Sequence, residues 1–167
     1  MIINFKGKVL QLATQRRRLP NGHVATVEII RHPGAVVIIP LLRKDQLILL
    51  KQFRPVIGTY LYELPAGTRD KNETPLNCAK REIIEETGYR AEKFTKLEKI
   101  YPVPGYSTEE ITIYKAEGLM KAFALKDPDE IIETHLMTKA RVRKLFQLGR
   151  IVDAKTICAL TFLRWLS

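Results

Sequence analysis

The sequence predicts a mixed α/β fold, and three observations lead to this prediction. The chain has 167 residues, which is a usual length for one domain. Strand-like segments stand before, between and after three helix-like segments, a pattern typical of a mixed sheet with helices packed on it. Residues 35–42 form an apolar run rich in β-branched side chains. Such a run fits a strand buried on both faces, so we expect it near the middle of the sheet.

The first 34 residues predict a separate N-terminal extension. Residues 6–30 read as a β-hairpin, because Asn21-Gly22 stands between two extended stretches and Asn-Gly is a strong hairpin signal. His32-Pro33-Gly34 then interrupts the chain. We therefore divide it into a β-hairpin extension over residues 1–34 and a main domain over residues 35–167.

The main domain contains further strands and three helices. Strands are expected over residues 46–53, 60–64, 94–101, 111–116 and 130–137. The first helix begins at Thr74-Pro75, an N-cap followed by proline, and ends at Gly88, where a C-terminal glycine is favoured. The second is capped by Thr138, and the third starts behind Asp153.

Composition excludes several classes of protein. The chain is 46% hydrophobic and 28% charged, which does not fit a disordered or low-complexity chain. Its two cysteines lie far apart and outside any CxxC pair, so neither a zinc site nor a disulfide framework is expected. No apolar run is long enough to cross a bilayer, and the first residues lack the features of a secretory signal. We expect a cytoplasmic protein without a membrane partner.

The first predicted helix carries the residues that point to chemistry. At about 100° per residue, Glu82, Glu85 and Glu86 fall on one face of this helix. Arg81 can offset part of their repulsion, but one guanidinium cannot balance three carboxylates. Oxygen ligands at this density suit Mg²⁺ or Mn²⁺, which in turn bind phosphate oxygens. The alternative is a solvated acidic face, but the turn at residues 63–67 should bring backbone groups beside the carboxylates.

The spacing around this helix resembles the Nudix box. The matching residues are Gly67, Glu73, Arg81, Glu82, Ile83, Glu85, Glu86, Gly88 and Tyr89, the last a softer match because the family usually has an aliphatic residue there. The resemblance implies an α/β/α sandwich that hydrolyses a nucleoside diphosphate linked to another moiety, with Mg²⁺ or Mn²⁺. By the same resemblance the metal ligands are Glu82, Glu85, Glu86 and the carbonyl of Ala66. Arg81 would orient the glutamates, and Glu73 would brace the loop.

Segments outside the box resemble the ADP-ribose pyrophosphatase subfamily. Pro104 lies 16 residues after Gly88, and residues 32–37, 52–55, 63–67 and 153–156 are similar to the same subfamily. This implies hydrolysis of ADP-ribose to AMP and ribose 5-phosphate. Arg54 would contact the diphosphate, and Glu63 would be a base or support the loop. The predicted substrate loop contains Pro104, Gly105 and Ser107.

The resemblance also implies a general base and a dimer. Glu130 is the best positional match for the base, with Asp129 and Glu133 as alternatives, in a short loop that proline stiffens. Glu85 and Arg81 would complete the catalytic group. The N-terminal hairpin would form a small antiparallel sheet that exchanges with a second subunit to build a homodimer.

Other functions stay open at this point. The substrate could be another nucleoside diphosphate sugar, a dinucleoside polyphosphate or the 5′ end of RNA. The net charge of +10 favours an anionic partner, and residues 16–18 are three consecutive arginines. No aromatic residues alternate with them to stack bases, so we do not expect nucleic acid. A nucleotide sensor without catalysis is a further alternative, although such sensors commonly lose a box glutamate.

Overall fold

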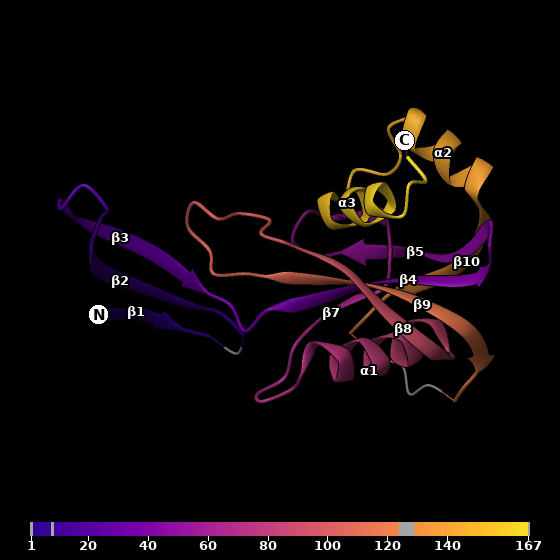
Figure 1. Cartoon of the computed structure of the whole chain (residues 1–167), viewed down its shortest axis with the longest axis horizontal. Coiled ribbons are helices and arrows are strands. Elements are labelled where there is room, and N and C mark those ends of the chain that lie inside the picture. The colour runs from indigo at the N-terminus through magenta and orange to yellow at the C-terminus, as the bar shows by residue number, and fades with distance from the viewer. Residues whose placement is uncertain (1, 8, 124–128, 167) are drawn as a thin grey trace.

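The computed structural model describes residues 2–7, 9–123 and 129–166. A seven-stranded sheet lies between helix α1 (Pro75–Thr87) on one face and helices α2 (Lys139–Gln147) and α3 (Ala154–Phe162) on the other (Figure 1). A separate three-stranded antiparallel sheet precedes it. The predicted α/β/α sandwich with a small N-terminal sheet is confirmed.

The seven-stranded sheet is mixed. Its main path runs β10-β5-β4-β9-β8, with β6 paired to β5 and β7 paired to β4. The β4–β9 pair is parallel, and the other pairs are antiparallel. The strands are β4 (Ala35–Arg43), β5 (Gln46–Arg54), β6 (Thr59–Glu63), β7 (Ala66–Thr68), β8 (Tyr89–Ile100), β9 (Ile111–Lys121) and β10 (Ile132–Thr138).

Strand β4 supplies both layers of the hydrophobic core. Val36 and Ile38 pack in the cluster on the α1 side, whereas Val37 and Ile39 pack with side chains from α2 and α3. All four side chains are fully buried. Alternate residues of a strand face opposite sides of the sheet, so one continuous apolar run anchors helices on both faces.

The N-terminal sheet projects away from the sandwich (Figure 1). It contains β1 (Ile2–Lys6), β2 (Gln11–Arg18) and β3 (Val24–Arg31) in the order β1-β2-β3. Its link to the main domain includes Ile30, whose N–H donates to the carbonyl of Tyr106 at 2.7 Å and whose carbonyl accepts from Thr108 N–H at 3.0 Å. The loop after β8 therefore touches both sheets.

Several boundaries differ from the sequence predictions. Strand β1 extends the predicted hairpin to three strands, and β7 forms where we expected a turn. Strand β8 starts at Tyr89, directly after Gly88, instead of residue 94, because pairing with β9 continues to Lys121. Long-range pairing thus extends segments whose local pattern is weak. No helix in the described part of the chain is long and apolar enough to cross a membrane.

Candidate active site

Helix α1 carries the predicted carboxylates and is capped at both ends. Thr74 accepts a hydrogen bond from the N–H of Asn77 at 3.2 Å, and Gly88 adopts a left-handed conformation with φ of 72°. The helix therefore begins and ends where the sequence predicted. Glu82 and Glu86 lie on its buried side, whereas Glu85 is half-exposed.

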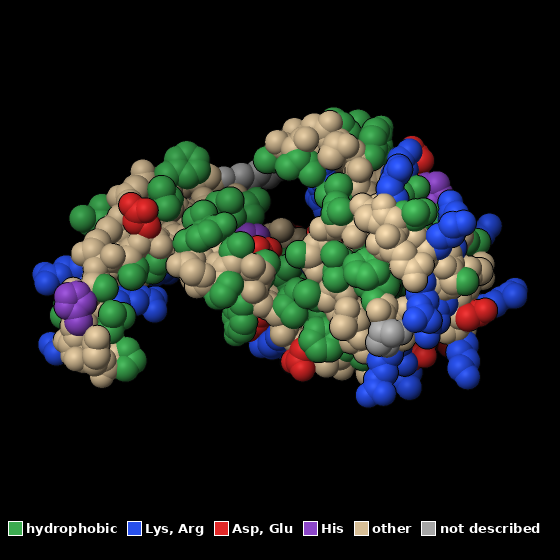
Figure 2. Space-filling view, turned by 90° about the horizontal axis from the view of Figure 1, so that it is seen from above, with side chains coloured by type: hydrophobic (Ala, Val, Ile, Leu, Met, Phe, Trp, Pro, Cys, Tyr) green, Lys and Arg blue, Asp and Glu red, His purple; other side chains and the backbone are tan. Residues whose placement is uncertain are grey.

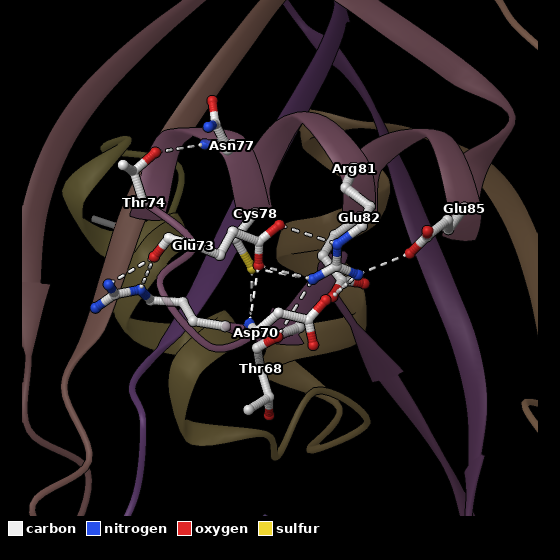
Figure 3. A network of polar contacts seen from close by, with 11 residues as sticks. Thr68, Asp70, Glu73, Thr74, Asn77, Cys78, Arg81, Glu82 and Glu85 are labelled. Carbon is white, nitrogen blue, oxygen red and sulfur yellow. Dashed lines mark hydrogen bonds and ion pairs between the residues drawn. The ribbon is translucent and has the colours of Figure 1, made fainter.

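Arg81 is the centre of a network of polar contacts (Figure 3). Its Nη1 donates to Glu82 Oε1 at 2.7 Å and to Glu85 Oε2 at 2.9 Å. Its Nε and Nη2 donate to the two carboxylate oxygens of Glu73, at 3.1 and 3.0 Å. Arg81 hydrogen bonds lower the pKa of Glu73 to about 2. The predicted bracing role of Glu73 thus has a physical basis, an ion pair between the loop and the helix.

Two carboxyl groups of the box are buried. Glu82 is 8% exposed and Glu86 is 4% exposed. Desolvation, with the nearby charges of Glu85 and Glu130, raises the pKa of Glu82 to about 7 despite the opposing effect of Arg81. Desolvation also raises the pKa of Glu86 well above its usual range, helped by Glu82 and Glu130. Burial and the neighbouring carboxylates thus disfavour the charged form of both groups, and a nearby cation would favour it.

The backbone of β7 lies against these carboxylates. The N–H of Ala66 donates to Glu86 Oε2 at 2.9 Å. A Cβ placed on Gly67 would come within 1.8 Å of Glu82 Oε1. The close approach of Glu82, and not an unusual backbone conformation, therefore disfavours a side chain at position 67, and the carbonyl of Ala66 belongs to the same short strand.

The residues fit a hard divalent cation by their chemistry. Within residues 2–7, 9–123 and 129–166, no three carboxylate, imidazole or thiol groups form a ready-made metal site. This agrees with Glu82 and Glu85 being paired to Arg81. The donors are nevertheless all oxygens, and a divalent cation would stabilise the charged form of the two buried carboxyl groups.

A cavity of about 230 Å³ opens beside strand β7. Arg54 and Lys155 line it together with Ala66 and Gly67 of β7. Glu109 also contributes to the lining. Arg54 lies close enough to Glu86 for its positive charge to lower the pKa of that carboxyl group. The cavity thus has a basic wall, and Arg54 on that wall lies near the Glu86 carboxyl group of α1.

Glu63 lies behind the basic wall and is only 1% exposed. It accepts hydrogen bonds from Arg54 and from Lys155. Desolvation alone would raise its pKa, but the bonds from Arg54 and Lys155 outweigh that effect and the pKa is lowered. Glu63 is therefore a paired anion rather than a group that faces the cavity.

The structure brings Glu130 to the carboxylates and places the Pro104 loop elsewhere. Glu130 raises the pKa of both Glu82 and Glu86, so its carboxylate lies near them. Pro104, Gly105 and Ser107 line another hollow of about 250 Å³, shared with Arg17 of the N-terminal sheet. The prediction that proline stiffens the Glu130 loop concerns residues 124–128 in part, and these lie outside the described residues.

Sequence reasoning assigned no role to Lys155 or Glu109. Both residues come to the cavity only through folding, Lys155 from the first turn of α3 and Glu109 from the segment before β9. The segment 153–156 was similar to the subfamily, and that similarity was the available signal for Lys155. Glu109 carried no local signal of its own.

Comparisons with known proteins agree with this geometry. The model of the NUDIX domain matches residues 31–160. The chain is 37% identical to an ADP-ribose pyrophosphatase of Bacillus subtilis over 96% of this chain and 88% of that protein. It is 35% identical to a methanol dehydrogenase activator of Bacillus methanolicus, with the same coverage. A crystal structure of an ADP compounds hydrolase has the same fold, with a TM-score of 0.82 at 23% identity over 97% of this chain and 88% of that one.

Proposed function

Since the chain belongs to the NUDIX family, we propose that it hydrolyses the diphosphate bond of ADP-ribose to AMP and ribose 5-phosphate. The observation that carries this proposal is the cavity itself. Two cationic side chains, Arg54 and Lys155, line it, and Arg54 lies near Glu86 on the carboxylate face of α1. Binding of a metal-complexed diphosphate uses cationic groups and carboxylates together. Guanidinium and ammonium groups bind the diphosphate oxygens directly, and carboxylates bind its divalent cation.

Each residue has a role in the proposed reaction. Glu82, Glu85, Glu86 and the Ala66 carbonyl would hold Mg²⁺ or Mn²⁺. When bound, such a cation neutralises phosphate charge and makes water easier to deprotonate. Arg54 would bind the diphosphate.

Glu130 would accept the proton of the attacking water as the new bond to phosphorus forms and the bridging P–O bond breaks. Arg81 would keep the box glutamates in place, as its contacts with Glu82 and Glu85 suggest. Asp129 and Glu133 are the alternative bases. The loop of Pro104, Gly105 and Ser107 would contact the nucleoside end of the substrate.

We propose a homodimer that exchanges the N-terminal sheet. Supporting this, β1 is an edge strand of the three-stranded sheet, and among the described residues β2 is its one pairing partner. Its side chains Ile2, Ile3 and Phe5 are 69%, 50% and 62% exposed, and the sheet extends away from the main domain (Figure 2). Exposed apolar patches of this kind mark interaction surfaces.

A substrate panel tests the activity. Purified protein with Mg²⁺ or Mn²⁺ is offered ADP-ribose, other ADP-sugars, a GDP-sugar, diadenosine polyphosphates and 5′-triphosphate RNA, with phosphatase-coupled phosphate release. We expect the highest kcat/KM for ADP-ribose and loss of turnover in Glu86→Gln. Higher turnover of another substrate would change the assignment, and ligand binding without any turnover would indicate a sensor.

A further inference from the structure

We propose that Glu63 is a positioning residue that holds Arg54 and Lys155 together on the cavity wall, so that both cations bind the diphosphate of the substrate. This inference rests on the proposed function. It assigns Glu63 neither to catalysis nor to substrate contact. The residue would act only through the two side chains that it pairs.

The geometry of the three residues is specific. Arg54 Nε donates to Glu63 Oε1 at 2.7 Å, and Arg54 Nη2 donates to Oε2 at 2.6 Å. This is the two-pronged arrangement that fixes a guanidinium in orientation as well as in distance. Lys155 Nζ donates to the same Oε2 and also to Asp153 Oδ1 at 2.9 Å. A single buried carboxylate thus fixes both cations.

Burial explains why Glu63 itself cannot serve as the base. The side chain is 1% exposed, and both its oxygens accept hydrogen bonds from cations. Those bonds lower its pKa below the usual value, which makes it a weaker proton acceptor. Arg54 and Lys155, by contrast, line the cavity and retain 37% and 17% of their side-chain exposure.

Three separate elements meet at this carboxylate. Arg54 ends β5, Glu63 ends β6 and Lys155 lies in the first turn of α3. The neighbouring Thr156 accepts a buried hydrogen bond from the N–H of Leu64 at 2.9 Å. The end of β6 is therefore locked to the start of α3. Without an anion between them, two cations held by this rigid framework would repel each other.

Glu63→Gln tests the proposal most directly. The substitution keeps the shape but replaces an acceptor oxygen with an NH₂ group that faces two cationic donors. We expect kcat/KM for ADP-ribose to fall by about 10²-fold, mainly through a higher KM, the scale seen when binding groups are misplaced. The matched control is Glu117→Gln, which removes an ion pair with Lys115 at 2.9 Å on β9 and should leave both constants unchanged.

A mutant cycle separates positioning from other roles. In the background Arg54→Gln with Lys155→Met, Glu63 has no cation left to hold, so adding Glu63→Gln should cost less than about 3-fold. This non-additivity is the signature of residues that act through one another. An equal loss in both backgrounds would overturn the proposal. Loss of the acidic limb in the pH profile of kcat would also overturn it, because a general base acts only when deprotonated and its titration produces that limb.

Two further measurements test the positioning role independently. The first applies if Glu63→Gln does not fold, and the second applies if ADP-ribose is not the substrate. Asp153→Asn keeps a good helix cap but removes the second partner of Lys155, and we expect a several-fold higher KM. Calorimetric binding of pyrophosphate with Mg²⁺ needs no nucleoside. Weaker binding in Glu63→Gln, with wild-type protein inactive on ADP-ribose, would refute the proposed substrate and support positioning. Unchanged binding would refute positioning.

Discussion

At the scale of single residues, the candidate site depends on pairing between neighbours. Arg81 contacts Glu73, Glu82 and Glu85, so one guanidinium fixes three carboxylates of the box. Glu86 is held instead by the backbone N–H of Ala66. These different partners explain why residues that are close in sequence have different electrostatic environments.

Glu130 should affect the chemical step more than substrate binding. Glu130→Gln removes the proposed proton acceptor, and we expect kcat to fall by about 10² to 10⁴-fold, the usual contribution of a general base, with KM within a few-fold of wild type. Steady-state kinetics with ADP-ribose measure both constants. Asp129→Asn and Glu133→Gln serve as comparisons. A larger loss of kcat in either of them would assign the role of general base to that residue.

Gly67→Ala tests the close approach of β7 to the helix. Since the new Cβ would lie 1.8 Å from Glu82 Oε1, the Glu82 side chain must move. We expect the Mg²⁺ concentration for half-maximal activity to rise about 10- to 100-fold, as when groups that orient metal ligands are changed. A magnesium titration of activity measures this, and an unchanged titration would show that Glu82 tolerates the displacement.

At the scale of elements, the site is built where the ends of strands and helices meet. Strand β7 and the loop after it lead directly into α1, while β5 and α3 supply the cations of the cavity wall and β6 supplies Glu63, which pairs with both. The contacts that join these elements should therefore influence stability as well as activity.

The ion pair between Glu73 and Arg81 should make stability depend on pH. Arg81 lowers the pKa of Glu73 from 4.5 to about 2. A carboxyl group with a lowered pKa stabilises the fold above pH 4.5, and this contribution is lost as the pH falls towards 2. Glu73→Gln should cost about 2 kcal/mol near pH 7, the range for hydrogen bonds to charged groups, and less below pH 4. Urea unfolding at several pH values measures it, and a difference that is independent of pH would contradict this assignment.

Thr156 should contribute to stability through its hydroxyl group. In Thr156→Ala the N–H of Leu64 loses its buried acceptor, and an unsatisfied buried donor costs about 1 to 3 kcal/mol. The matched control is Thr161→Ala on the same helix, since Thr161 is exposed and its hydroxyl group donates to the carbonyl of Ile157 in its own helix. Chemical denaturation should show a much larger loss for Thr156→Ala, and equal losses would disprove the role of the β6 contact.

At the scale of the whole molecule, the net charge bears on the encounter with anionic substrates, and the N-terminal sheet bears on the proposed contact with a second subunit. The net charge of +10 would attract anionic substrates from solution. The arginines at residues 16–18 are exposed on β2, in the sheet that projects from the main domain (Figure 2). Basic residues therefore lie on the projecting sheet as well as around the cavity.

The exposed apolar side chains of β1 should hold two subunits together. Replacing Ile3 and Phe5 with arginine places charge on that surface, and we expect the dimer to become a monomer in light scattering. Leu148→Arg is the control, because Leu148 is 62% exposed beyond α2, away from the N-terminal sheet. A wild-type monomer, or a double variant that stays dimeric, would exclude dimerisation through β1.

The sequence by itself determined the fold class and the acidic half of the site. These features can be recognised from local sequence. The apolar run of β4 and the caps Thr74 and Gly88 show directly in the order of neighbouring residues, and the box shows in its spacing. The sequence also placed Arg54 and Glu130 among the candidates through resemblance.

Only the tertiary structure decided the partners of those residues. Strand β7 forms because β4 pairs with it, and Lys155 reaches Glu63 across 92 positions of the chain. Glu63, a candidate by sequence for the base or for loop support, pairs with two cations in the structure. Local pattern encodes which face of a helix or strand is apolar, but it does not encode which distant side chain completes a buried ion pair. That depends on how strands and helices pack, since burial makes each charge require a partner.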